Sequence, residues 1–131
     1  MNGRLLDTLI DRLPFDLTVA QSRVIDEIES DLESEVPMHR LLQGDVGSGK
    51  TIAALAGLLA VVEGGHQGAL MVPTEVLADQ HFLSISTMLD GFMVTDRDPT
   101  SLLRERELRV VLFTSKMSSM ERDRVLVDLA A

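Results

Sequence analysis

Residues 44–51 read GDVGSGKT, and a nearly continuous apolar segment, TIAALAGLLAVV, overlaps their end and runs to Val62. Apolar side chains fall on almost every side of the helix expected over residues 49–63, and a helix of that kind is buried. Gly64 and Gly65 end it, because glycine readily adopts the conformation that closes a helix. The stretch therefore requires another layer of structure, which we expect to be a sheet, to cover the helix.

The glycine-rich sequence ahead of that helix matches the pattern G-x-x-x-x-G-K-[ST]. Its glycines let backbone N–H groups turn inward at the positive end of the helix dipole, which makes a binding site for an anion. Lys50 can reach the β and γ phosphates of a nucleotide, and the Thr51 hydroxyl can ligate Mg²⁺. The alternative is a glycine-rich turn that only precedes a buried helix. We predict Lys50 and Thr51 as the catalytic residues, Thr51 as the Mg²⁺ ligand, and a phosphate site made of Gly44, Asp45, Val46, Gly47, Ser48, Gly49, Lys50 and Thr51.

The other patterns alternate between strand and helix. Short apolar runs predict strands over 38–43, 68–73 and 109–113, and the last of these, RVVLF, has β-branched residues at its centre. Helical spacing begins near Thr18, again at Thr74 or Glu75, and again at Ser119. Strands that alternate with helices of ~10 to 15 residues pair in parallel through right-handed crossovers. We therefore predict an α/β fold, with the charged segment 96–107 as a surface excursion.

Three residues upstream of the phosphate site could bind the base of the nucleotide. Phe15 and Leu17 offer an apolar surface, and the Gln21 amide can pair with N6 and N7 of adenine. Gln21 also lies three residues after Thr18, so these two residues can form a capping box at the start of a helix. The spacing does not choose between the two roles of Gln21, and both can hold at once.

Composition and charge limit the class of protein. The 131 residues suit one compact domain, and 45% hydrophobic with 25% charged residues excludes a disordered chain. There is no cysteine and no secretory cleavage pattern, so we expect a cytoplasmic protein. The net charge of -9 weakens a nucleic-acid interpretation. It does not exclude one, because seven of the 12 Lys and Arg residues lie between Arg97 and Arg124.

Four segments resemble the opening motifs of superfamily-two helicases and together are most similar to the RecG-type branched-DNA helicases: LPFDLTVAQSRVIDEI, MHRLLQGDVGSGKT, MVPTEVLADQHF and LFTSK. The resemblance covers most of residues 13–117 and implies a P-loop NTPase (RecA-like) three-layer fold with a mostly parallel sheet. It implies an ATP-dependent helicase or translocase that uses ATP and Mg²⁺ and acts on branched or forked DNA in recombination and repair. It also implies a set of nucleic-acid residues: Pro73, Thr74, Glu75, Gln80 and His81 in the third segment, and Thr114, Ser115 and Lys116 in the fourth.

The chain departs from the helicase pattern at several positions. The family's Thr-Gly-Ser appears here as Thr114-Ser115-Lys116, which replaces a glycine that would allow a backbone contact to DNA. The segment 96–107 looks inserted relative to the family. Transcription-repair coupling translocases share much of the pattern but usually carry Tyr where this chain has Ser48. Such a translocase is the second interpretation.

The resemblance also predicts a domain organisation. We expect residues 1–16 to form a lead-in helix or linker, and residues 17–131 to form the N-terminal part of the first RecA-like helicase lobe, truncated before the Asp-Glu box. The remaining lobe and the branch-recognition domain are absent from this sequence, so the isolated chain is expected to be inactive. Residues 124–130, RVLVDLA, imitate a Walker-B strand near Asp128, but the charges at 121–124 favour a helix. If the chain is a complete gene product, a nucleotide-binding module without turnover is the alternative.

Overall fold

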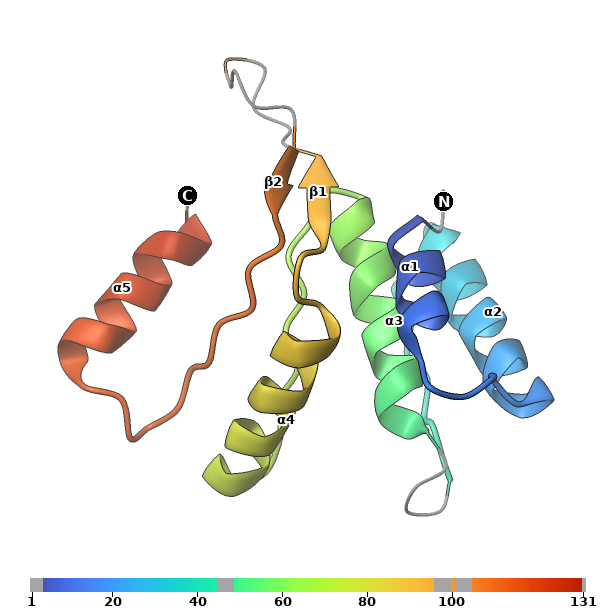
Figure 1. Ribbon diagram of the computed structural model, residues 1–131, viewed down its shortest axis with the longest axis horizontal. Coiled ribbons are helices and arrows are strands. Elements are labelled where there is room, and N and C mark those ends of the chain that lie inside the picture. Colours follow the sequence, from blue (N-terminus) through green and yellow to red (C-terminus); the bar gives the residue numbers. More distant parts are fainter. Residues whose placement is uncertain (1–3, 45–48, 96–99, 101–104, 131) are drawn as a thin grey trace. The chain divides into compact units, whose positions relative to one another are not determined.

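The computed structural model describes residues 4–44, 49–95, 100 and 105–130. In these ranges the helices are α1 (Arg4–Arg12), α2 (Val19–Glu33), α3 (Lys50–Glu63), α4 (Glu75–Met88) and α5 (Ser119–Ala130), and the strands are β1 (Met93–Thr95) and β2 (Glu105–Glu107) (Figure 1). They fall into two compact units, Met1–Ala69 with Val94–Arg106 and Leu70–Met93 with Glu107–Ala131. None of the helices in the described ranges is both long and apolar enough to cross a lipid bilayer.

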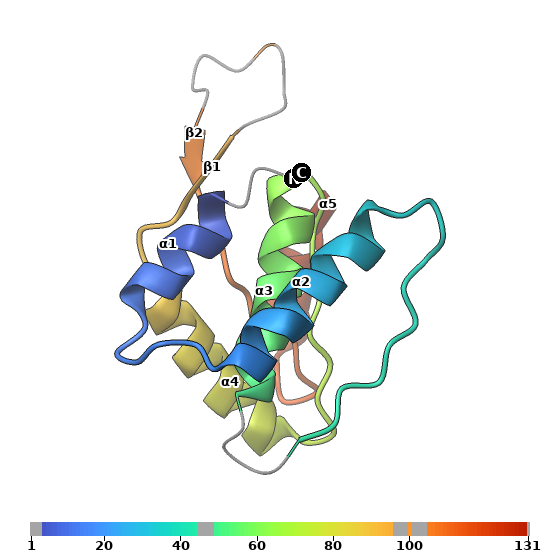
Figure 2. The same cartoon turned by 90° about the vertical axis from the view of Figure 1, so that its right-hand side faces the viewer.

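Helix α3 is the centre of the first unit and packs against both α1 and α2 (Figure 2). Leu9 of α1 and Leu55 and Leu59 of α3 are the largest fully buried side chains among the described residues. Gly57 lets α2 approach α3 closely, because a Cβ at Gly57 would lie 3.3 Å from the Ile28 side chain. The predicted burial of α3 is therefore confirmed. In this unit, however, two helices cover α3, where the sequence predicted a sheet.

The cap signals of α2 and α3 are formed as the sequence predicts. Thr18 Oγ1 accepts a hydrogen bond from Gln21 N at 3.1 Å, and Gln21 Oε1 accepts one from Thr18 N at 2.9 Å, which completes the capping box. After α3, Gly65 adopts a φ of 87° and donates to Val62 O at 2.8 Å. That bond gives a partner to a carbonyl that the end of the helix would otherwise leave without one.

The second unit contains α4 and α5, and both helices begin at side-chain caps. Thr74 Oγ1 accepts a hydrogen bond from Leu77 N at 3.2 Å, so α4 starts at Glu75. Ser118 and Glu121 form a reciprocal capping box at the start of α5, with N–H to oxygen distances of 3.2 and 3.3 Å. The buried apolar residues of this unit are few: Ile85, Leu89, Phe92 and Val125.

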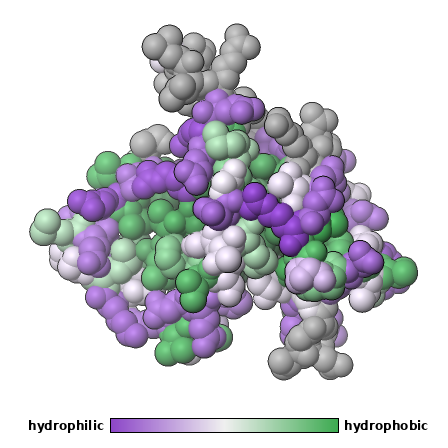
Figure 3. All heavy atoms as spheres, in the orientation of Figure 1, coloured by the Kyte–Doolittle hydropathy of each residue, from purple (hydrophilic) through white to green (hydrophobic). Residues whose placement is uncertain are grey.

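The three segments predicted to be strands, 38–43, 68–73 and 109–113, have no regular structure in the described part of the chain. A strand is defined by its hydrogen bonds to a neighbouring strand, and within the described residues the only paired strands are β1 and β2. Apolar side chains of these segments are exposed as a result, and Figure 3 shows apolar residues, in green, at the surface in several places. The exposed members are Met38, Leu41, Leu70, Met71, Val111 and Phe113.

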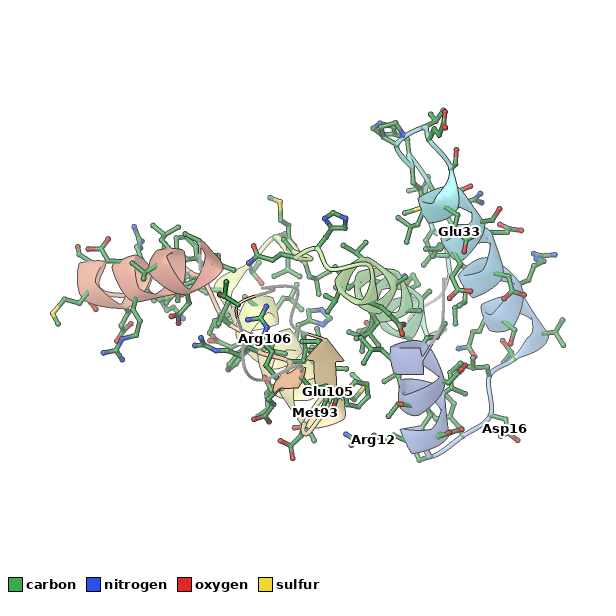
Figure 4. All side chains as sticks on the ribbon, turned by 90° about the horizontal axis from the view of Figure 1, so that it is seen from above. Arg12, Asp16, Glu33, Met93, Glu105 and Arg106 are labelled. Carbon is green, nitrogen blue, oxygen red and sulfur yellow. The ribbon has the colours of Figure 1, made fainter. Side chains whose placement is uncertain are left out.

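The strands β1 and β2 pair with each other, and a hydrogen bond from Leu108 N to Phe92 O, at 2.7 Å, continues the pair. Figure 4 labels Met93 of β1 and Glu105 of β2 on these two neighbouring strands. The end of the predicted surface excursion 96–107 is thus a strand, because β1, just before this segment in the sequence, supplies its partner. All three residues of β2 are exposed, and residues 96–99 and 101–104 lie outside the described ranges.

Candidate functional site

Gly49 caps the N-terminus of α3, at the end of the predicted phosphate loop. Its φ of 86° and ψ of 24° lie in the left-handed region, which glycine occupies without strain. Space excludes a side chain as well, because a Cβ at Gly49 would overlap the Gln21 amide nitrogen and lie 3.1 Å from Gln21 Cδ. The first N–H groups of a helix have no partner inside it and attract anions. The start of α3 therefore has the conformation and the donors that a phosphate site requires.

Lys50 is the first residue of α3, and its Nζ donates a hydrogen bond to the carbonyl oxygen of Gly44 at 2.7 Å. This bond joins the two ends of the predicted loop. An ammonium group has three donors, so Lys50 can keep Gly44 as a partner and still donate to a phosphate. Thr51 follows, half-buried, in the first turn of α3. The remaining predicted phosphate residues, Asp45, Val46, Gly47 and Ser48, lie outside the described residues.

The Gln21 amide links α2 to the start of α3. Its Oε1 belongs to the capping box with Thr18, and its Nε2 lies against Gly49. An amide oxygen has two lone pairs, so its place in the capping box leaves acceptor capacity for another donor. Of the other predicted base-binding residues, Phe15 is half exposed and Leu17 is partly buried, and both lie between α1 and α2.

Arg40, which lies shortly before Gly44, connects the approach to the loop with α2. Arg40 Nε donates to Asp31 Oδ2 at 2.7 Å, and Arg40 Nη1 donates to Glu27 Oε2 at 2.8 Å. The hydrogen bond from Arg40 holds the pKa of Asp31 below its ordinary value of 3.8. Sequence reasoning does not identify Arg40. The available signal was a pair of acids one helical turn apart with an arginine shortly after the helix.

A second group of predicted site residues meets in the second unit. The Ser115 hydroxyl donates to Glu75 Oε1, and Lys116 Nζ lies 3.4 Å from Glu75 Oε2. Arg122 Nη2 of α5 donates to the Ser115 carbonyl oxygen at 2.9 Å. We call these four residues the Glu75 cluster. Sequence reasoning does not identify Arg122, although the S-x-x-E pattern at 118–121 marks the start of the helix that carries it.

The charges of the Glu75 cluster are matched locally. The hydrogen bond from Ser115, followed by Lys116, holds the pKa of Glu75 below its ordinary value of 4.5. Glu75 is also in the first turn of α4, where the helix dipole favours a negative charge. Of the other predicted nucleic-acid residues, Thr74 caps α4 and Thr114 N donates to Met117 Sδ at 3.2 Å. Pro73, before α4, is exposed. On α4, Gln80 is exposed and His81 is partly buried.

Asp128 lies in α5 and not in a strand, so the Walker-B interpretation of residues 124–130 is wrong. Its Oδ2 accepts a hydrogen bond from Arg109 Nη2 at 2.7 Å. A Walker-B acid ends a strand and holds Mg²⁺ at the phosphates. Elsewhere in the described ranges, no three His, Cys, Asp or Glu side chains are grouped to hold a metal ion.

A left-handed glycine at the start of a buried helix and a lysine that donates back to Gly44 agree with the P-loop class of protein that the motif predicts. A family model described as "DEAD/DEAH box helicase" matches residues 18–125. The chain therefore belongs to the DEAD/DEAH box helicase family, whose domain has a RecA-like P-loop fold.

Within that family the chain is similar to proteins named ATP-dependent DNA helicase RecG, which confirms the predicted resemblance. It is 57% identical over 94 residues to the protein of Aquifex aeolicus (strain VF5), which covers 72% of this chain and 12% of the relative. It is 47% identical over 122 residues to the protein of Bacillus subtilis (strain 168), and this alignment covers 93% of this chain and 16% of the relative. For the Synechocystis protein the identity is 43% over 119 residues, covering 88% and 14%. No solved structure matches the chain.

Proposed function

We propose that the chain is the ATP-binding portion of the first motor lobe of an ATP-dependent DNA helicase. Its similarity to proteins named ATP-dependent DNA helicase RecG supports this proposal. The observation that carries it is the packing of the Gln21 amide against Gly49. A group able to pair with adenine thereby lies at the start of the helix whose N–H groups attract phosphate. The cysteine-free composition is consistent with the cytoplasm as its compartment.

In this proposal the nucleotide is ATP, and Mg²⁺ neutralises part of the phosphate charge when it is bound. Phe15, Leu17 and Gln21 bind the adenine, and the backbone of residues 44–49 surrounds the phosphates. Lys50 donates to the β and γ phosphates, and the Thr51 hydroxyl ligates the metal. The conformation of Gly49 and the position of Lys50 in the first turn of α3 support this ligand, since the first N–H groups of a helix attract an anion and the ammonium group can donate to it.

We further propose that segments 38–43, 68–73 and 109–113 are strands of a mostly parallel sheet in a three-layer domain, with residues 1–16 as a lead-in. The exposure of their apolar side chains supports this, because Leu41 and Met71 are 82% and 93% exposed. Side chains of this kind are buried when a strand lies inside a parallel sheet with helices on both faces.

The DNA partner is proposed to bind the second unit, through Pro73, Thr74, Glu75, Gln80 and His81 on the α4 side and Thr114, Ser115 and Lys116 on the other. The structural support is the Glu75 cluster, which gathers three of these residues in one place. Branched or forked DNA is the proposed substrate of the whole protein, as the resemblance of the sequence motifs to RecG-type branched-DNA helicases implies. This chain spans 12% to 16% of the length of the relatives.

Lys50→Ala tests the nucleotide site. We expect the ATP affinity of the 131-residue chain, measured with a fluorescent analogue, to fall by about 10-fold to 100-fold, because a charged hydrogen-bond donor to phosphate is lost. Lys116→Ala is the matched control, since it removes the same residue type from the other unit and should leave ATP affinity unchanged. Equal affinity of the wild-type chain and Lys50→Ala would reject the phosphate role.

A further inference from the structure

Both carboxylate oxygens of Glu75 face a donor in the Glu75 cluster. Oε1 accepts the Ser115 hydroxyl hydrogen bond, and Oε2 faces the Lys116 ammonium at 3.4 Å. The Glu75 side chain is only 33% exposed, whereas that of Lys116 is 62% exposed. The acid is therefore the better-fixed member of the pair, and the lysine is the member that can change position.

The turn that carries Ser115 and Lys116 is held from the other side by α5. Arg122 Nη2 donates to the Ser115 carbonyl oxygen, and the buried Arg122 Nε has no hydrogen-bond partner in the part of the chain that the structure describes. Thr114 and Met117 close the same turn, with Met117 N donating to Thr114 O at 3.3 Å. One cation, Lys116, and one hydroxyl, that of Ser115, thus face the Glu75 carboxylate, and Arg122 holds the backbone of the turn that carries both donors.

The contact between Lys116 and Glu75 is longer than a direct charge-assisted hydrogen bond, which measures about 2.7–2.9 Å. Exposed ion pairs of this type contribute little to stability. A phosphodiester carries one negative charge shared by two non-bridging oxygens, so it can accept from the same hydroxyl and the same ammonium as a carboxylate does. One pair of donors therefore suits either the Glu75 carboxylate or a phosphodiester.

We propose that Glu75 takes the place of a DNA phosphodiester in the nucleic-acid-free chain, and that DNA binds here only when Ser115 and Lys116 exchange this carboxylate for a phosphate. Glu75 then acts as a built-in competitor that lowers DNA affinity, although it stands among the predicted DNA-side residues. The inference rests on the proposed function, because it requires that DNA contact Lys116.

Glu75→Gln tests the competition, because the amide keeps the shape and an acceptor for Ser115 but removes the charge. We expect the affinity of the 131-residue chain for a fluorescent single-stranded DNA to rise by about threefold to tenfold at low salt. Lys116→Ala should lower that affinity and reduce the slope of log affinity against log salt by about 0.7. In the Lys116→Ala background, Glu75→Gln should have a smaller effect, because only the Ser115 donor is left to compete for. Asp79→Asn is the control, since it makes the same charge change one turn further along α4.

The outcomes separate the two proposals. If Lys116→Ala leaves DNA affinity and its salt slope unchanged, the DNA interface proposed for this unit is wrong. If Lys116→Ala weakens binding but Glu75→Gln also weakens it or leaves it unchanged, the interface stands and the competition is rejected. If Asp79→Asn raises DNA affinity as much as Glu75→Gln does, the rise comes from weaker general charge repulsion, and the inference is overturned. Thermal melting of each variant checks that the fold is kept. Glu75→Ala is a second variant that removes the charge, and it should raise DNA affinity as Glu75→Gln does.

Discussion

Gln21 has two neighbours that place different demands on its side chain. The amide oxygen of Gln21 accepts a hydrogen bond from the backbone N–H of Thr18. The amide nitrogen of Gln21 occupies the space beside Gly49 that a Cβ would fill if residue 49 were not glycine. One conformation meets both demands, because the oxygen and the nitrogen of the amide lie on opposite branches of the same planar group. The requirement for glycine at position 49 thus comes partly from another helix, and not only from the φ of the loop.

Gln21→Ala is expected to lower helix stability and also to reduce the preference for ATP over GTP. The capping box is lost, which costs about 0.5–2 kcal/mol in unfolding free energy, and the group that can pair with adenine N6 and N7 is removed. Thr18→Ala is the matched control, since it breaks the same capping box and leaves the Gln21 amide in place. Denaturant melts and parallel ATP and GTP titrations measure the two effects. If both variants keep the same gap between ATP and GTP affinity as the wild-type chain, Gln21 is a cap and nothing more.

In the proposed DNA site, residues 114–116 differ from the helicase pattern in the groups that they offer. The glycine expected from the helicase pattern is Ser115 here, and its carbonyl oxygen is occupied by Arg122. The donors that this turn presents come instead from the side chains of Ser115 and Lys116. If DNA binds this turn as proposed, the change from backbone to side-chain donors makes the contact dependent on the Lys116 charge, and therefore on salt.

At the level of elements, α2 carries an unbalanced row of acids. Glu29 lies three residues after Asp26 and four before Glu33, which places all three on neighbouring turns of one helix. Partial burial raises the pKa of Glu29 above its ordinary value of 4.5, and Asp26 and Glu33 raise it further. The ionised form of Glu29 therefore destabilises α2 at neutral pH.

Glu29→Gln is expected to stabilise the chain at pH 7 by about 0.5 kcal/mol, the scale of two like-charge helix pairs, and solvent screening keeps the gain small. Because the pKa of Glu29 is raised in the folded chain, its carboxyl takes up a proton more readily when folded than when unfolded. The wild-type chain should thus recover the difference as the pH falls below about 4.5. Urea melts of both proteins at pH 7 and at a pH below about 4.5 measure the difference in unfolding free energy. Glu35→Gln, beyond the end of α2, is the control with the same charge change, and a gain there of equal size would contradict the local explanation.

The helices were predictable from the sequence, whereas the three predicted strands have no paired neighbour in the described residues. Thr18, Thr74 and Gly64-Gly65 mark helix ends by local hydrogen bonds, so the information lies within a few residues of each cap. A strand needs a partner that sequence spacing does not supply, and RVVLF at 109–113 stays unpaired while ERE at 105–107 pairs with β1. In the candidate site, the motif predicts Lys50 and Gly49, but the long-range contacts of Arg40 and Arg122 depend on tertiary packing.

For the whole molecule, the two proposed activities fall in different units. The nucleotide residues described lie in the first unit, and the Glu75 cluster lies in the second. The relatives are several times longer than this chain, which covers 12% to 16% of their length. Coupling of ATP hydrolysis to movement along DNA in a helicase requires parts that open and close around the nucleotide.

The 131-residue chain alone is expected to bind ATP without hydrolysing it at a helicase-like rate. Lys50 and Thr51 supply only part of the chemistry, since phosphoryl transfer also needs an acid to hold the metal, a group to orient the attacking water and a cationic finger. Asp128, the residue in the Walker-B-like stretch, lies in α5 and accepts a hydrogen bond from Arg109, whereas a Walker-B acid ends a strand. An arginine finger alone contributes about 10³- to 10⁵-fold to the rate of such enzymes. The measurement is the rate of DNA-stimulated phosphate release by this chain, compared with that of a protein of full RecG length. For each protein, the variant with the phosphate-loop lysine changed to alanine gives the background rate. Turnover by the short chain that depends on Lys50 and approaches the rate of the longer protein would show that its own residues complete the site.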